Sequence, residues 1–172
     1  MSSRLRIALL ALVAGLFTLA GCQKEASEGR PSSAGGQAAP AAEQRAPLML
    51  PASQSDDDWK RYIGQQVSRN VRVKRGIPPF AVYVSPDEDP FPVIDNARQT
   101  LQRGVVKDTI IAFGSRDSQL MATQMVELFK DIPADRLKGA RVVFVGDAAH
   151  RGVAESAVAP SGAEFIFLEF GK

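Results

Sequence analysis

The sequence has few of the residues that redox, metal and nucleotide sites require. Its 172 residues include one cysteine, Cys22, and one histidine, His150. A single cysteine allows no internal disulfide, and without a Cys-x-x-Cys motif the chain is not a redox thioredoxin. One histidine and scattered carboxylates give no metal-ligand spacing, so we expect no metal and no cofactor. No Walker motif and no Gly-x-Gly-x-x-Gly is present, which leaves nucleotide binding without support.

Apolar runs long enough to cross a membrane are also missing. An apolar stretch without charge extends from Ile7 to Ala20 and follows two basic residues, Arg4 and Arg6. Its length is below the roughly 20 residues that span a bilayer core. A basic start, a short apolar run and small residues at its exit are typical of a secretory signal peptide, here residues 1–21.

The signal peptide ends in Leu19, Ala20, Gly21 and Cys22, and these four residues resemble the lipobox of bacterial lipoproteins. The resemblance implies that Cys22 receives a diacylglycerol thioether, that cleavage falls before it, and that its new amino group is acylated. Three acyl chains exceed the two lipid signals that stable anchoring needs. Gln23, rather than aspartate, follows the cysteine, and by the same resemblance this favours the outer membrane, with the domain facing the periplasm.

Residues 22–54 are rich in Ala, Gly, Ser, Pro, Gln and Glu, so we expect a disordered tether that first touches the fold or a partner near 48–51. Residues 55–172 are enough for one compact domain. Removing Arg4 and Arg6 with the signal peptide leaves 19 basic and 19 acidic side chains. This balance gives no indication of nucleic-acid binding.

Strand and helix patterns alternate through the domain. We expect helices at about 56–69, 93–103, 117–130 and 148–158, and strands at 80–84, 109–113, 141–145 and 164–168. The strands are apolar at nearly every position, as strands covered on both faces require. The pattern predicts a three-layer α/β fold with a largely parallel four-stranded sheet and an N-terminal helix. A mixed thioredoxin-like or ferredoxin-like sheet is the alternative, because the last strand could return antiparallel.

Polar residues gather where the predicted strands end, which is where open parallel sheets bind ligands. The candidate crevice residues are Asp87, Ser115, Arg116, Asp117, Ser118, Asp147 and His150. The segment 114–118 opens a helix, so its serines and aspartate can either cap that helix or help to bind an anion. Ser115, Asp147 and His150 include an Asp-x-x-His pattern that resembles SGNH-type esterases, but the nucleophile and oxyanion blocks of that family are absent.

A second candidate surface is basic. Asn70 to Arg75 has alternating valines and predicts a short edge strand, and an exposed edge can be extended by a strand of another protein. The partner-binding candidates there are Arg69, Arg72, Lys74, Arg75 and Phe80. Two functions remain open: a lipid-anchored, non-catalytic module that docks on another cell-envelope protein, and a small hydrolase that uses Ser115, Asp147 and His150.

Overall fold

The computed structural model describes residues 46–172, so the signal peptide, Cys22 and the first part of the tether lie outside the described residues. The helices are α1 (Asp56–Asn70), α2 (Phe91–Arg103), α3 (Ser118–Phe129) and α4 (Arg151–Val158), with short 3₁₀ turns at Ala148–His150 and Ala159–Ser161. The strands are β1 (Phe80–Tyr83), β2 (Ile110–Gly114), β3 (Arg141–Gly146) and β4 (Glu164–Glu169). None of the helices in residues 46–172 combines the length and apolarity needed to cross a membrane.

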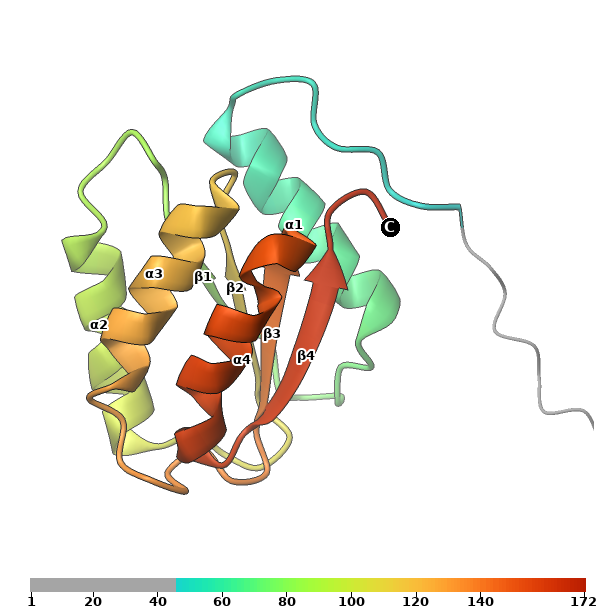
Figure 1. Ribbon diagram of the computed structural model, residues 1–172. Coiled ribbons are helices and arrows are strands. Elements are labelled where there is room, and N and C mark those ends of the chain that lie inside the picture. Colours follow the sequence, from blue (N-terminus) through green and yellow to red (C-terminus); the bar gives the residue numbers. More distant parts are fainter. Residues whose placement is uncertain (1–45) are drawn as a thin grey trace, which may run out of the picture. The chain divides into compact units, whose positions relative to one another are not determined.

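All four strands are parallel, in the order β1-β2-β3-β4. The predicted α/β fold is therefore confirmed, and the parallel pairing of β4 with β3 excludes the mixed-sheet alternative. Each crossover moves the chain one strand further in the same direction. Crossovers of one hand then place α2, α3 and α4 together on one face of the sheet, as Figure 1 shows. The strand order never reverses, so the sheet has no topological switch point at which a ligand cleft would open.

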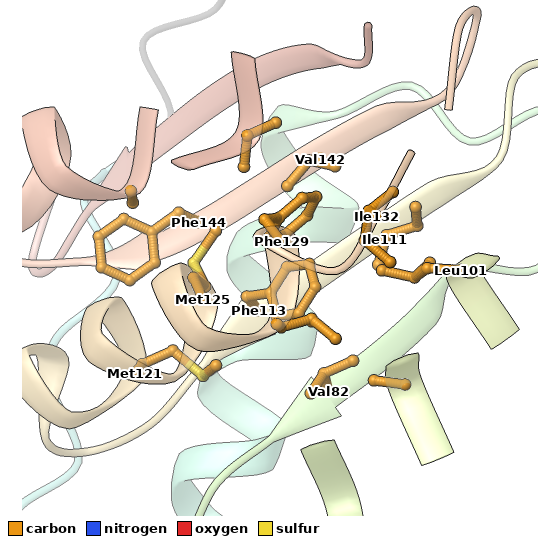
Figure 2. Packing of buried hydrophobic residues seen from close by; sticks show 14 of the residues in the cluster. Val82, Leu101, Ile111, Phe113, Met121, Met125, Phe129, Ile132, Val142 and Phe144 are labelled. Carbon is orange, nitrogen blue, oxygen red and sulfur yellow. The ribbon is translucent and has the colours of Figure 1, made fainter. Parts of the chain in front are cut away.

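The larger core lies between the sheet and α2, α3 and α4. Phe113 of β2 and Phe129 of α3 are buried there with their ring centroids 5.7 Å apart. Figure 2 shows these rings beside Met121 and Met125 of α3 and Phe144 of β3. Because β2 and β3 are buried along nearly their whole length, they need apolar side chains at successive positions, which explains their unbroken hydrophobic runs.

A second core lies on the opposite face, under α1. Trp59, Tyr62, Ile63 and Val67 recur at helical spacing and pack against the strand residues that point away from the larger core. The helix packs closely on β2, where a methyl group built on Gly114 would lie 2.5 Å from Cδ1 of Ile63. The α1 layer completes the three-layer architecture.

Residues 46–54, which the composition assigns to a disordered tether, lie along α1. Leu48 packs against the second core, and the Ala46 carbonyl accepts a 2.9 Å hydrogen bond from Arg69 near the end of α1. At the other end, Trp59 Nε1 donates to the Ser53 carbonyl over 3.1 Å. Within the described residues, contacts with the domain therefore extend back to Ala46.

The predicted edge strand at 70–75 is wrong. The helix continues to Asn70, and the following residues form a loop with a turn in which Ile77 N–H donates to the Lys74 carbonyl over 3.1 Å. Val71 is buried against the second core, whereas Val73 is exposed, so neither valine takes part in strand pairing and only the first serves packing. Gly76 has a φ of 84°, which breaks an extended conformation, and Pro78 and Pro79 have no N–H to donate. The edge strand on this side of the sheet is β1.

Candidate functional site

The carboxyl ends of the strands meet the first turn of α1. Here the segment after β1 and the segment after β2 lie close to Asp56, which the sequence indicates only as a first-turn residue of a helix. The side chain that joins these three segments is Arg116, which lies two residues beyond the end of β2.

Arg116 is held by its own neighbours. Its guanidinium forms an ion pair with Asp87 and a hydrogen bond with the Gln54 carbonyl, and Nη1 lies 3.6 Å from Oδ1 of Asp56. The side chain is only 13% exposed. The hydrogen bond to Asp87 and the charges of Asp87 and Asp56 outweigh burial and raise the pKa of Arg116. Because its donors already face protein acceptors, Arg116 fastens the chain before α1 to the sheet rather than presenting a free cation.

Asp56 is the second member of this carboxyl-end cluster, which consists of Arg116, Asp87, Asp56 and Tyr83. Its Oδ1 accepts a 2.8 Å hydrogen bond from the Tyr83 hydroxyl at the end of β1. Burial alone would raise the pKa of Asp56. Hydrogen bonds from Ser85 and Tyr83, together with the positive charges of Arg116 and Lys60, outweigh burial and leave that pKa below its usual value. Burial and the contact with Asp56 raise the pKa of the Tyr83 hydroxyl, which keeps it protonated as a donor.

The serines of the candidate crevice are buried and bonded to backbone groups. Ser115 has no accessible surface, and its Oγ accepts a 3.0 Å hydrogen bond from Asp117 N–H. Ser118 Oγ accepts a 2.9 Å hydrogen bond from Asp147 N–H, which links the ends of β2 and β3. The Asp117 carboxylate accepts from Leu120 N–H over 2.9 Å and so caps α3. Of the two interpretations of segment 114–118, the geometry supports capping, because the aspartate occupies the position that an anion would take.

His150 stands apart from these serines. It lies in the 3₁₀ turn after β3, and its side chain is half-buried and forms no hydrogen bond or ion pair within residues 46–172. The His150 backbone N–H donates to the Asp147 carbonyl over 3.1 Å, but no side-chain hydrogen bond in that range connects the imidazole to Ser115 or to Asp147. A serine nucleophile needs a base within hydrogen-bond reach and an accessible oxygen, and the described geometry provides neither.

The basic stretch does not form one free surface. Arg69 binds the Ala46 carbonyl, and Lys74 forms a 2.8 Å ion pair with Asp108. Phe80 is half-buried against the larger core. Arg72 and Arg75 are exposed and have no ion pair in residues 46–172, so they are the cations of this stretch that remain available.

Two members of the carboxyl-end cluster, Asp56 and Tyr83, are not among the sequence candidates. A signal for Tyr83 exists, because a tyrosine near the end of a buried strand needs a partner for its hydroxyl. Asp56 carries no such signal, since acidic residues in the first turn of a helix are common. The described residues hold no group of three or more His, Cys, Asp or Glu side chains arranged to bind a metal.

No protein-family model, curated protein or solved structure matches this chain. The case for its function therefore rests on its own residues and their geometry.

Proposed function

We propose that this protein is a lipid-anchored, non-catalytic module that faces the periplasm from the outer membrane and docks on another protein of the cell envelope. The lipobox resemblance at Cys22 supports the anchor. The observation that carries the non-catalytic part is the arrangement around Arg116, in which Arg116, Asp87, Asp56 and Tyr83 satisfy one another. A catalytic site keeps polar groups free for its substrate, whereas this cluster holds α1 and residues before it on the sheet.

The availability of Arg72 supports docking on the side of the loop before β1. This arginine is exposed and has no ion pair in the described part of the chain, and arginine is enriched among the residues that dominate protein interfaces. His150, at the carboxyl end of β3, lies at the opposite end of the strands from the loop that contains Arg72. A probe at position 72 therefore reports on the proposed docking side, and a probe at position 150 reports on the carboxyl ends of the strands.

The test is site-specific photocross-linking of the full chain in living cells. A photoreactive residue at position 72 should capture one discrete envelope protein, and the same residue at position 150 should not. The reverse pattern would contradict the proposed docking side. Turnover of a model ester that disappears in both Ser115→Ala and His150→Ala would contradict the non-catalytic function and support the hydrolase.

A further inference from the structure

The outer edge of β1 has unpaired backbone groups. Val84 N–H donates to the Gly114 carbonyl of β2 over 3.2 Å. Because successive residues of a strand in a parallel sheet direct their backbone groups to opposite sides, Phe80 and Val82 also face β2, and Ala81 and Tyr83 face outward. Among the described strands, β1 pairs only with β2, and Ala81 is exposed. The N–H and C=O groups of Ala81 and Tyr83 are therefore free to pair with a further strand.

An apolar groove of about 130 Å³ runs beside this edge, between β1 and α1. Ala81 and Tyr83 line one side, and Ile63, Gly64 and Val67 line the other. The groove exists because α1 packs mainly over β2, β3 and β4 and leaves the same face of β1 partly uncovered. In a strand added next to β1, every second side chain would point toward this groove.

Gly64 keeps the groove open. It lies in the middle of α1, where glycine destabilises a helix relative to alanine. Nothing in the fold requires it, because a methyl group built there meets no atom within 4 Å and its φ is not in the left-handed region. Gly114 shows the contrast, since a methyl group there would clash with Ile63. The absence of a side chain at Gly64 leaves room for a group from outside the domain.

The charge beside the groove is positive. Lys60 lies one helical turn before Gly64, lines the groove, and places its Nζ 5.2 Å from the centre of the Tyr83 ring. It forms no salt bridge within residues 46–172. The Lys60 ammonium interacts with the Tyr83 ring and with the charge of Asp56 but is bound directly by no carboxylate of the described residues. A strand lying along β1 would therefore find this ammonium next to its aliphatic side chain, and a carboxylate is the complementary group.

Beside the other edge strand, β4, the protein's own side chains pack on both faces of the sheet. Phe170 follows this strand and packs against Trp59 and Tyr62, with ring centroids 5.4 and 6.1 Å away. On the opposite face, Arg151 lies over the Phe167 ring at 5.8 Å. Of the two edges, β1 is the one that leaves space for a side chain of a partner.

We propose that β1 binds an extended strand of another protein, which pairs with the free groups of Ala81 and Tyr83, places an aliphatic side chain in the groove beside Gly64, and presents an acidic residue to Lys60. This inference rests on the proposed docking function and specifies the chemistry of the partner. An extended strand fits better than a helix because only a strand supplies backbone partners to an open sheet edge.

The probe is a capped hexapeptide, Thr-Val-Thr-Glu-Thr-Val, titrated into the full chain solubilised in detergent. Its valines and its glutamate are two positions apart, so they share the face that would point toward the groove and Lys60. We expect saturable binding and slower amide hydrogen exchange at Ala81 and Tyr83. The matched peptide Thr-Val-Thr-Lys-Thr-Val should bind at least tenfold more weakly because its lysine repels Lys60. Failure of the acidic peptide to bind at millimolar concentration, or binding that leaves these two amides unprotected, would overturn the proposal.

Two variants locate the site. Gly64→Leu should fill the groove and weaken binding at least tenfold without lowering the melting temperature, since the position is open and leucine favours a helix. Gly152→Leu is the matched control: its position in α4 is equally open but borders a different groove, between α3 and α4. Equal binding by the wild-type chain and Gly64→Leu would place the site elsewhere.

The same variants distinguish this inference from the docking function. If an envelope protein co-purifies equally with the wild-type chain and Gly64→Leu, docking stands and its placement at β1 is wrong. If no envelope protein co-purifies with either, the docking function itself fails. If Ala81 and Tyr83 become protected as the concentration of the chain rises without peptide, the occupant is a second copy, and the proposed partner is wrong.

Discussion

The Tyr83 hydroxyl donates a 2.8 Å hydrogen bond to the Asp56 carboxylate and so joins the end of β1 to the first turn of α1. These residues are 27 positions apart in the chain. The bond lies next to the ion pair of Arg116 with Asp87, so the start of α1 and the segments after β1 and β2 are held by one set of polar contacts. Replacing Tyr83 by phenylalanine should therefore destabilise the fold while keeping its packing.

For Tyr83→Phe we expect a loss of about 1–2 kcal/mol in the free energy of unfolding, because a hydrogen bond to a charged acceptor is removed. Chemical unfolding monitored by circular dichroism measures this loss. Tyr62→Phe is a control for the loss of a hydroxyl elsewhere, since Tyr62 binds Gln66 and Gly171 rather than a carboxylate. An unchanged stability in Tyr83→Phe would show that water replaces the bond without cost.

The Asp56 carboxylate should also contribute to acid sensitivity. Its pKa in the folded protein lies below the ordinary value of 3.8, so its charged form stabilises the fold above that pH. This contribution is lost as the pH falls through the lowered pKa. Between about pH 6 and pH 3 the wild-type chain should therefore lose more stability than Asp56→Asn. Asp57→Asn, at the exposed neighbouring position, is the control. Parallel pH profiles for wild type and Asp56→Asn would contradict the assignment.

The strands and a largely parallel sheet could be predicted because strands buried on both faces need unbroken apolar runs. Phe113 and Phe144, for example, lie in runs that only a doubly covered strand explains. The direction of β4 was left open by its sequence, and the structure pairs it parallel to β3. The division of the buried residues into two cores, one on each face of the sheet, could not be predicted from the sequence. Ile111 and Val143 belong to opposite faces of the sheet, and this depends on which strand residues face α1.

The polar contacts could be predicted only in part. Asp87 and Arg116 both follow strands, so their proximity is a consequence of parallel topology. The contact with Asp56 depends on how α1 crosses the sheet, which its own periodicity does not reveal. The valines of 70–75 led to a strand that does not exist. Alternation alone does not show whether a neighbouring strand is present to pair with.

Two glycines near α1 should respond to alanine in opposite directions. Gly114→Ala places a methyl group 2.5 Å from Cδ1 and 3.0 Å from Cγ1 of Ile63, and such overpacking costs roughly 1–3 kcal/mol. Gly64→Ala meets no atom within 4 Å and should stabilise the protein by about 0.5–1 kcal/mol through helix propensity. Urea unfolding of both variants measures the difference. Stabilisation by Gly114→Ala would contradict the close packing of α1 on β2.

The larger core should be sensitive to truncation at β2. Ile111 is fully buried against α2, α3 and α4, so Ile111→Ala should cost about 2–5 kcal/mol. Val106→Ala, at a largely exposed valine in the loop before β2, should change stability little. Thermal unfolding of both variants is the measurement. An unchanged melting temperature in Ile111→Ala would contradict the position of β2 in the core.

The anchor is tested at the two residues on which the lipobox resemblance depends. Cys22→Ala should remove the only thiol that can be acylated, so cells fed radioactive palmitate should label the wild-type chain but not the variant. Gln23→Asp keeps the cysteine and should still be labelled, but the labelled protein should move from the outer-membrane to the inner-membrane fraction, since aspartate after the cysteine is the retention signal that the resemblance implies. Label on Cys22→Ala would contradict lipidation at this residue. Label on Gln23→Asp that stays in the outer-membrane fraction would leave lipidation intact and contradict the sorting signal alone.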